Sequence, residues 1–600
     1  MTLLKKPVLD NWNLNDLVHS HKDKHFSNIL KSIENDIKRI ELLRSELTND
    51  IKNETFLSIL KKIESLVEKI SIVSGYAQLK YASDTSSNEI AALVTKMDSL
   101  SSVIENRLLF FDLWFKKDLS SKKFNSLIKS IPVEYMEYLK HKRLLGKYSL
   151  TEKEEKIINI LEVTGSNALV KIYDRMTNNL DFFMKFTKGK KRITKKFSNK
   201  EKIISFVRSV NPQERIDAYT ALLETYNANS GVLGEIYQNL VLQWSDENIN
   251  LRGFISPISV RNISNNVDDA TVNTLLDVCK SNSYIFQEYF IEKAKILGYK
   301  KLKRYHLYAP YSNNVKTRSF SYEKAVNLVL KTFESFDPVF MQYAERIFNQ
   351  QHVDSPIRRG KMSGAFCSTI SPKITPYVLL NYDGKLRDVS TMAHEFGHAI
   401  HSIAASNLPI SVSHAPLPLA ETASVFAEML LNDNLTKSIT DQEKKILLAE
   451  QIDDMYATIL RQSFFTIFEV DAHNLIVNKN ATIDEISDIY IQNLKTQFGN
   501  SVDISDDFRY EWLYIPHFYH TPFYCYAYSF GNLLVLSLYQ IFKNEGKAFV
   551  PKYLKILSAG GSKKPEVLLQ EAAGIDITKS EFWQQGFNLV SEKINNLRNL

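Results

Sequence analysis

The feature that most constrains this chain is the pentapeptide His394-Glu395-Phe396-Gly397-His398, which has the pattern H-E-x-x-H. On a helix, positions i and i+4 lie on one face, so both imidazoles can point at one metal ion. Glu395 faces the same side, as a base that deprotonates a metal-activated water must. Asp388 and Ser390 precede the motif and suit the start of a helix. The pattern therefore predicts a metal-binding helix.

A zinc site of this kind needs a third protein ligand and leaves one position open for water. The next carboxylate after His398 is Glu421, which follows a proline-containing loop and starts a helical pattern. The chain can therefore turn and bring a second helix against the first. Because H-E-x-x-H also occurs by chance on buried helices, this second element matters. We expect His394, His398 and Glu421 to bind one zinc ion per chain.

Two more residues near the motif have several interpretations. His401 lies three residues beyond His398, toward a neighbouring face, so it is a candidate ligand, an outer partner of a ligand or a surface residue. Glu428 lies two helical turns beyond Glu421 on the same face. It is placed to accept a hydrogen bond from a metal-binding histidine.

Composition predicts a mainly helical protein. Gly and Pro are scarce, at 19 and 16 of 600 residues, and 44% of the residues are hydrophobic. Such a chain can form a large core with few tight turns. Amphipathic helical patterns recur in residues 13–75, and helical periodicity continues to about residue 300. The basic, glycine-containing stretch 188–200 is the best candidate for a linker.

The cysteines, the apolar segments and the net charge limit the cellular compartments and the partners that we expect. Cys279, Cys367 and Cys525 are far apart and in no C-x-x-C pair, which indicates a reducing compartment. No run of eighteen apolar residues predicts a membrane span, and the N-terminus has no apolar signal segment. The net charge of +7 is mild, and the Lys-rich stretches lack a base-stacking motif, so we expect no nucleic-acid binding. We predict a cytoplasmic protein.

A small antiparallel sheet is predicted just before the metal helix. Residues 363–368 and 376–382 are short runs of small, β-branched or aromatic residues, and Asp383-Gly384 is a turn signal. An edge strand beside a zinc site can hold an extended peptide by main-chain hydrogen bonds. Gly364, Ala365 and Phe366 are therefore candidate substrate-binding residues. The alternative is a hairpin with a purely structural role.

Residues 512–531 are dense in aromatic side chains. Such stretches usually belong to a core, but the five tyrosines and two histidines of this one are polar, and each buried hydroxyl needs a partner. Phenols and an imidazole beside a metal can donate hydrogen bonds to the oxyanion of a tetrahedral intermediate. The stretch is thus a candidate catalytic element.

These residues together carry a resemblance to a known family. The chain resembles oligoendopeptidase F, of the thimet-oligopeptidase-like group of zinc metallopeptidases. The similarity covers nearly the whole chain, and its most specific stretches are His394–His401, Glu421–Glu428, Gly360-Lys361, Gly364–Phe366, Arg461-Gln462, Ile515–Tyr519 and Phe523–Tyr528.

The resemblance implies a mainly α, two-lobed helical zincin with a deep substrate channel and a small β-sheet beside the H-E-x-x-H helix. It implies an N-terminal helical region at 1–115, a helical oligopeptidase N-terminal domain at 116–197 and a zinc metallopeptidase catalytic domain at 198–600. The implied activity is hydrolysis of internal bonds in short oligopeptides. We expect a monomer or a simple homo-oligomer.

The resemblance also implies residue roles. His394, His398 and Glu421 would bind zinc, and Glu395 would be the general base. His517, with Tyr524 or Tyr526, would contact the substrate or the oxyanion. His306 departs from similar proteins, which often have an acid there, and we expect the change to be harmless.

Two other functions remain open. One is a catalytically silent scaffold that keeps the fold, which the intact set of ligands and base disfavours. The other is an exopeptidase that trims dipeptides from C-termini. Side-chain preference, the natural substrates and the limits of peptide length do not follow from the sequence.

Overall fold

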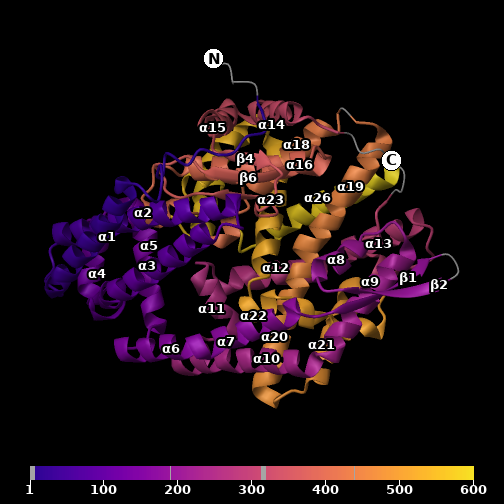
Figure 1. The fold of residues 1–600 in the computed structure, drawn as a ribbon, viewed down its shortest axis with the longest axis horizontal. Helices are drawn as coiled ribbons and strands as arrows, with labels where there is room; N and C mark the ends of the chain where they lie inside the picture. The colour runs from indigo at the N-terminus through magenta and orange to yellow at the C-terminus, as the bar shows by residue number, and fades with distance from the viewer. Residues whose placement is uncertain (1–6, 189–190, 312–318, 438) are drawn as a thin grey trace. The chain divides into compact units, whose positions relative to one another are not determined.

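In the computed structural model, the chain forms two compact units, each assembled from three separate stretches of sequence. The structure describes residues 7–188, 191–311, 319–437 and 439–600. Helices make up most of both units (Figure 1), as composition predicts. The first unit consists of Met1–Ser149, Thr317–Ser438 and Leu538–Asp576, and the second of Leu150–Lys316, Ile439–Ser537 and Ile577–Leu600.

The first unit holds the N-terminal helices, the helices that flank the H-E-x-x-H motif and one three-stranded sheet. Its helices are α1 (Lys24–Leu42), α2 (Asn53–Ser83), α3 (Asn88–Leu113), α4 (Ser121–Ile128), α5 (Met136–Leu145), α14 (Tyr322–Phe336), α15 (Pro338–Asn349), α16 (Leu386–Ala404), α17 (Ile410–Ser413), α18 (Ser424–Leu435), α24 (Val550–Ser558) and α25 (Pro565–Ala573). Its strands are β4 (Val353–Pro356), β5 (Phe366–Ser368) and β6 (Tyr377–Tyr382).

The second unit holds the remaining helices, and α23 begins in it and ends in the first. Its helices are α6 (Glu152–Thr164), α7 (Ser166–Asn178), α8 (Lys200–Phe206), α9 (Pro212–Ala228), α10 (Ser230–Trp244), α11 (Pro257–Ser264), α12 (Asp269–Ser281), α13 (Ser283–Ile296), α19 (Asp441–Met455), α20 (Arg461–Lys479), α21 (Ile483–Phe498), α22 (His517–His520), α23 (Tyr526–Glu545) and α26 (Ser580–Asn599). Its strands are β1 (Phe182–Lys188), β2 (Lys191–Phe197), β3 (Leu302–Lys303) and β7 (Val502–Asp503).

The N-terminal helices share a hydrophobic core with the sheet that leads into the metal helix. Ile33 and Ile37 of α1 and Tyr76 of α2 are buried in one cluster with Tyr377 and Leu379 of β6. The spacing of the α1 residues places them on one face of the helix, as the amphipathic pattern predicts. This core supports the strand directly before α16.

The sheet beside the metal helix has three strands in the order β4-β6-β5. β5 pairs antiparallel with β6, so the predicted antiparallel pair is confirmed. β4 adds a third strand, parallel to β6, that was not predicted, because a parallel partner can lie far away along the chain and has no turn signal. β5 lies at an edge of the sheet.

The prediction of a linker at 188–200 is wrong for residues 188 and 191–200, and residues 189–190 lie outside the described part of the chain. β2 pairs antiparallel with β1, and α8 begins at Lys200. Phe182 and Met184 are buried while Phe183 and Lys185 are exposed, which is the alternation of a half-buried strand. In β2 itself every residue before Phe197 is exposed, so the stretch carries no alternation of apolar and polar residues that would predict a strand. The predicted domain bounds 1–115, 116–197 and 198–600 and the predicted substrate channel stay predictions.

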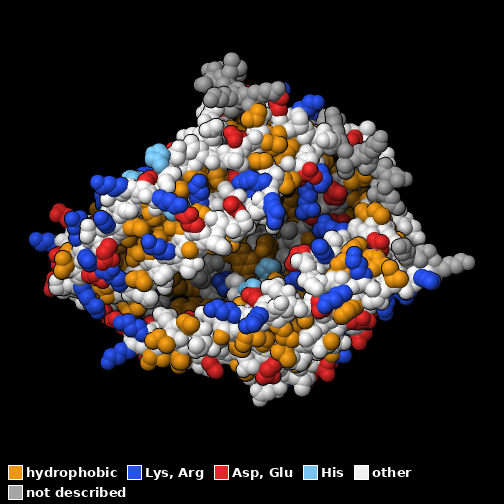
Figure 2. All heavy atoms as spheres, in the orientation of Figure 1, with side chains coloured by type: hydrophobic (Ala, Val, Ile, Leu, Met, Phe, Trp, Pro, Cys, Tyr) orange, Lys and Arg blue, Asp and Glu red, His pale blue; other side chains and the backbone are white. Residues whose placement is uncertain are grey.

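Three features of the described residues relate to the composition. No helix among them is long and apolar enough to cross a membrane. All three cysteines are free thiols. Figure 2 shows Lys and Arg side chains interspersed with Asp and Glu over the visible face.

Candidate metal centre

The metal helix α16 begins directly after β6, at a tight turn. Gly384 adopts a φ of 83°, a conformation that L side chains rarely take. The backbone N–H groups of Asp383 and Lys385 each donate to Asp388 Oδ2 at 2.9 Å. Asp388 thus satisfies donors at the start of the helix, where a negative charge also suits the helix dipole. The turn and this cap fix where the motif starts.

Gly397, inside the motif, allows a second chain segment to lie against α16. A Cβ atom at this position would lie 2.5 Å from both the carbonyl oxygen of Ala423 and the Cα atom of Ser424. These are backbone atoms, so they cannot rotate away as a side chain can. The same segment carries Glu421. Because Gly397 has no side chain, this segment can approach α16 closely enough to place the third expected ligand beside the two histidines.

Glu421 lies in a turn three residues before α18 begins at Ser424. The sequence analysis placed it at the start of the helical pattern, so its position differs only slightly from the prediction. The Ser424 hydroxyl donates to Glu421 Oε2 at 2.6 Å. This hydrogen bond orients the carboxylate toward the two histidines of α16.

We expect Gly397→Ala to lower the free energy of unfolding by about 1–3 kcal/mol, the usual penalty of overpacking, and to weaken metal binding. The reason is that the added methyl group must push the Glu421 turn away from α16. The measurements are thermal unfolding and the metal content after dialysis against a buffered metal.

The matched control for this variant is Gly231→Ala, near the start of α10. No atom lies within 4 Å of a Cβ built at Gly231. Alanine should therefore be neutral or slightly stabilising there, since glycine is a poor helix former. Unchanged stability and metal content in Gly397→Ala would contradict the close-packing argument.

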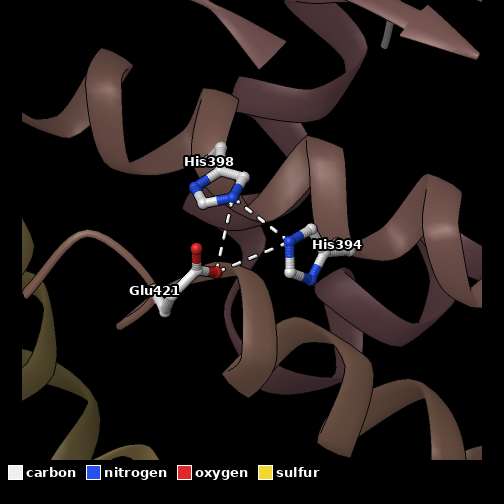
Figure 3. Close-up of side chains that lie close together, drawn as sticks. All are labelled: His394, His398 and Glu421. Atoms are coloured by element: carbon white, nitrogen blue, oxygen red, sulfur yellow. Dashed lines mark hydrogen bonds and ion pairs between the residues drawn. The ribbon is translucent and has the colours of Figure 1, made fainter. Parts of the chain in front are cut away.

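His394, His398 and Glu421 point toward one another (Figure 3). The two Nε2 atoms are 3.2 Å apart, and each lies 3.5 Å from Glu421 Oε2. Ligands 2.0–2.1 Å from one tetrahedral zinc ion are about 3.3 Å apart, and two imidazoles with a carboxylate are a common zinc donor set. The three residues therefore fit a zinc ion, as the motif and the next carboxylate predict.

Glu428 contacts His394 on the side of the ring opposite to Nε2. His394 Nδ1 lies 2.5 Å from Glu428 Oε1, so the imidazole can donate to this carboxylate and keep Nε2 free for a metal. The predicted contact between Glu428 and a histidine of the motif is confirmed. Burial opposes a positive charge on His394, but the hydrogen bond to Glu428 and three nearby carboxylates raise its pKa to about 9. The same surplus of negative charge favours a metal cation.

Replacing Glu428 with Gln should weaken metal affinity by about 10–100-fold, the usual effect of losing the charged partner of a metal-binding histidine. Gln keeps the size of the side chain but removes the charge that makes His394 a stronger donor. The measurement is a competition titration with a chromophoric chelator. Parent-like affinity would show that the charge of Glu428 does not act through His394.

Glu395 is the one carboxylate of the motif itself, and it is 7% exposed. Burial raises its pKa to about 7, with the opposing charge of His394 and the like charges of Glu421 and Glu428 as smaller effects. A carboxyl group with such a pKa can take up and release a proton near neutral pH. The backbone N–H of Cys367, on β5, interacts with the Glu395 carboxylate.

His401 does not join this group of ligands. Among the described residues, the set of side chains that can share a metal consists of His394, His398 and Glu421. His401 is buried, and this burial lowers its pKa to about 4. The candidate roles of a metal ligand and a surface residue are therefore wrong.

The segment that leads into β5 is anchored to β4 and β6 by the buried side chain of Lys361, whose burial the sequence did not predict. Lys361 Nζ lies 2.8 Å from Asp354 Oδ1 and donates to the carbonyl groups of Pro356 and Leu380 at 3.0 and 2.5 Å. Lysine is rarely buried unless it is paired in this way. Gly364, with a φ of 84°, turns the chain into β5.

The predicted catalytic aromatic residues belong to the second unit. The rings of His517 and Tyr524 stack with centroids 5.9 Å apart, and Tyr528 packs edge-on to both. Tyr528 Oη lies 3.5 Å from His517 Nε2. These three half-buried side chains form one cluster. Tyr526 is instead fully buried, and Asn265 Nδ2 donates to its hydroxyl oxygen at 2.8 Å.

The loop that carries Tyr524 is held in a strained conformation by buried groups that the sequence analysis missed. Phe523 has a φ of 57°, which is unfavourable for a large side chain. Its N–H donates to the buried Glu469 carboxylate at 2.9 Å, and Arg261 Nε donates to the carbonyl of Pro522 at 3.1 Å. Such strain often marks a functional loop. No local sequence signal links residues so far apart.

His306, the departure noted in the sequence, fills a buried position in the second unit. Arg215 Nε donates to His306 Nδ1 at 3.3 Å, and the imidazole stacks on Tyr299 with ring centroids 4.8 Å apart. Burial lowers the pKa of His306 to about 4. The neutral ring thus accepts a hydrogen bond from a buried guanidinium.

Comparison with known proteins identifies the family. The family model of peptidase family M3 matches residues 205–589. The chain belongs to this family. It is therefore a metalloendopeptidase, and the predicted resemblance to oligoendopeptidase F is confirmed. An oligoendopeptidase F homolog of Borreliella burgdorferi is 29% identical over 88% of both chains, and oligopeptidase PepF of Bacillus subtilis is 25% identical over 75% of this chain and 67% of its own.

Two solved structures have a similar fold. A candidate peptidase from Chlamydophila abortus superposes with a TM-score of 0.85 at 25% identity, over 98% of each chain. Oligoendopeptidase F from Enterococcus faecium superposes with a TM-score of 0.70 at 19% identity, over 96% of this chain and 99% of its own. The predicted mainly helical fold is confirmed.

Proposed function

We propose that this M3 peptidase is a zinc-dependent endopeptidase that hydrolyses internal bonds of short oligopeptides, with Glu395 as the general base. The observation that carries the proposal is the convergence of His394, His398 and Glu421 beside a buried carboxylate. The relatives that are named oligoendopeptidases and oligopeptidases support the substrate class.

The residues of the first unit divide the chemistry between them. His394, His398 and Glu421 hold the ion, and Glu428 keeps the His394 ring oriented. A bound zinc ion supplies Lewis acidity, which activates water and polarises a peptide carbonyl. Glu395 takes a proton from the attacking water onto a carboxylate oxygen and delivers it to the nitrogen of the leaving amine.

The substrate would lie along β5. An edge strand leaves one row of backbone N–H and C=O groups unpaired, and an extended peptide can pair with them. Gly364, Ala365 and Phe366 lie at the start of this edge, and Cys367 on the same strand interacts with Glu395. Pairing there would bring a peptide bond close to the base.

His517 and Tyr524 are our proposed donors to the oxyanion. Tyr524 is favoured over Tyr526, because the ring of Tyr526 is fully buried and its hydroxyl is already hydrogen-bonded to Asn265. Tyr528 packs against both proposed donors and is a further candidate. Phenylalanine at each tyrosine in turn, followed by measurement of kcat at saturating peptide, tests this assignment. A normal kcat for the Tyr524 variant would contradict it.

The proposed function has a direct test. The enzyme is given a folded protein, the same protein unfolded, and its fragments of roughly 5–20 residues, each with and without a chelator. We expect internal cleavage of the fragments that is lost with the chelator and restored by zinc. Release of C-terminal dipeptides alone would indicate an exopeptidase, and efficient cutting of the folded protein would contradict the oligopeptide preference.

We also propose a cytoplasmic location and a monomeric or simple homo-oligomeric state. The free cysteines support a reducing compartment. Fractionation of cells tests the location, and light scattering coupled to gel filtration tests the oligomeric state. Recovery outside the cytoplasm, or a large heterogeneous assembly, would contradict these proposals.

A further inference from the structure

A pocket of about 360 Å³ adjoins the metal centre within the first unit. It opens between the start of β5, which contributes Phe366 and Cys367, and the end of α16, which contributes His401 and Ser402. Its volume is at the low end of ligand pockets, which span ~300–1,000 Å³. It therefore suits one side chain of a bound peptide rather than a longer segment.

His401 is an unpartnered polar group in the wall of this pocket. Its side chain is 8% exposed, and among the described residues no hydrogen bond to its ring is found. Neither ring nitrogen counts among the fully buried unpaired atoms, so the exposed part of the ring faces the pocket. A neutral imidazole carries one N–H donor and one acceptor nitrogen, and a ligand in the pocket can hydrogen-bond to it.

The hydroxyl groups that line the pocket already donate hydrogen bonds within the protein. Thr369 Oγ1 donates to Ser402 Oγ at 2.6 Å, and Ser402 Oγ donates to the carbonyl of His398 at 3.1 Å. Ser413 Oγ donates to the carbonyl of Ile410 at 3.2 Å. Thr369 and Ser413 thus present lone pairs to the pocket. A ligand group that donates a hydrogen bond fits them best.

The segment that carries Ser413 and His414 is fixed by close backbone packing. Gly561 N–H donates to the carbonyl of Val412 at 2.8 Å, and a Cβ at Gly561 would lie 2.6 Å from the carbonyl oxygen of His414. On its other side, Ser411 Oγ donates to Glu64 Oε1 at 2.5 Å. The wall is thus positioned before any substrate arrives.

Charge selects against ionised side chains. Among the described residues that line the pocket, Glu395 is the one acid, and none is Lys or Arg. A substrate ammonium group could pair there only with Glu395, which would take the general base out of use, and the lining offers a substrate carboxylate no cationic side chain. Burying either ion without a proper partner is unfavourable. Small apolar residues such as Ala365, Ala415 and Ala420 leave room for an apolar stem.

We propose that this pocket binds a substrate side chain next to the cleaved bond, one with an apolar stem and an uncharged, hydrogen-bond-donating end, such as Tyr or Gln. The inference rests on the proposed peptidase function and adds a side-chain preference to it. His401 accepts from or donates to the end of that side chain, and His414 lies within the same pocket.

The test uses zinc-loaded enzyme and blocked host peptides in which one residue near the cleaved bond varies. The guests are Tyr against Phe, and Gln against Met, Glu and Lys, at each position on both sides of the bond. At one position we expect kcat/KM for Tyr to exceed that for Phe by about three- to tenfold, the worth of one net hydrogen bond. Gln should exceed Met, Glu and Lys there by a similar factor.

Two variants then localise the preference. In His401→Phe and in His414→Phe, the Tyr-to-Phe ratio should fall toward one, whereas the exposed control His25→Phe should keep the parent ratio. Zinc content is measured for each variant, and if His401→Phe fails to bind zinc or to fold, His414→Phe decides.

A parent enzyme without this preference at any position, a preference for Lys or Glu, or unchanged ratios in the zinc-loaded variants would overturn the pocket assignment alone. No cleavage of any host peptide would overturn the proposed function, and this inference with it.

Discussion

Replacing Glu395 with Gln is expected to lower kcat by about 10²–10⁴-fold, the usual contribution of general acid–base catalysis, while the protein keeps its metal. Gln has the shape of Glu but cannot take a proton from water. Glu395 is not one of the side chains that converge on the metal position, so the ligand set remains complete. The measurements are single-turnover cleavage of a blocked peptide and zinc content by mass spectrometry.

The matched variant is Glu395→Asp, which keeps a base but withdraws it by one methylene group. Its rate should lie between those of the parent and Glu395→Gln, because distance rather than chemistry is changed. A zinc-loaded Glu395→Gln enzyme with a near-normal rate would exclude Glu395 as the base. The next group to examine would then be His517.

The parts of the site that follow from sequence are those fixed by helical periodicity. His394 and His398 meet because residues four apart share a face. Glu428 lies seven residues after Glu421, a spacing that on a helix places both on one face. Because the segment of Glu421 packs against α16, Glu428 also faces α16 and contacts His394. Glu421 was found because it is the first carboxylate after His398 along the chain. Each of these inferences needed only the geometry of a helix and one reversal of the chain between His398 and Glu421.

The parts that escaped sequence analysis depend on contacts between distant residues. The Lys361 ammonium group is buried and donates to the carbonyl of Leu380 on β6, 19 residues away, although lysine side chains usually lie on the surface. Glu469 binds the N–H of Phe523, 54 residues away, and so shapes the loop that carries Tyr524. The parallel pairing of β4 with β6 also lacks a local signal. Tertiary contacts decide these features.

The aromatic stretch 512–531 could be predicted from the sequence only in part. The density of aromatic residues in 512–531 indicated both a core and a polar role, and the structure contains both. Tyr526 and Tyr519 are buried, whereas His517, Tyr524 and Tyr528 form the half-buried cluster. Burial of alternate tyrosines around the start of α23 depends on what packs against that helix, which the sequence does not show.

Replacing Glu421 with Ala is expected to reduce zinc affinity by more than the ~10–100-fold that follows loss of an outer partner, and to abolish activity in step with zinc content. The variant removes one of the three proposed ligands, and the two imidazoles that remain, 3.2 Å apart, share no third donor group among the described residues. It also removes the acceptor of the Ser424 hydroxyl.

The nearby acids are poor substitutes for Glu421. Glu428 contacts His394 Nδ1, the ring nitrogen that faces away from the proposed metal position. Moving this carboxylate to the metal would leave the His394 ring free to rotate. Glu395 could approach only by giving up its role as the base. Excess zinc should therefore restore little activity in Glu421→Ala, whereas Glu421→Asp should recover part of the affinity, because it keeps a carboxylate. Zinc binding as tight as that of the parent in Glu421→Ala would mean that another carboxylate, Glu428 first, completes the site.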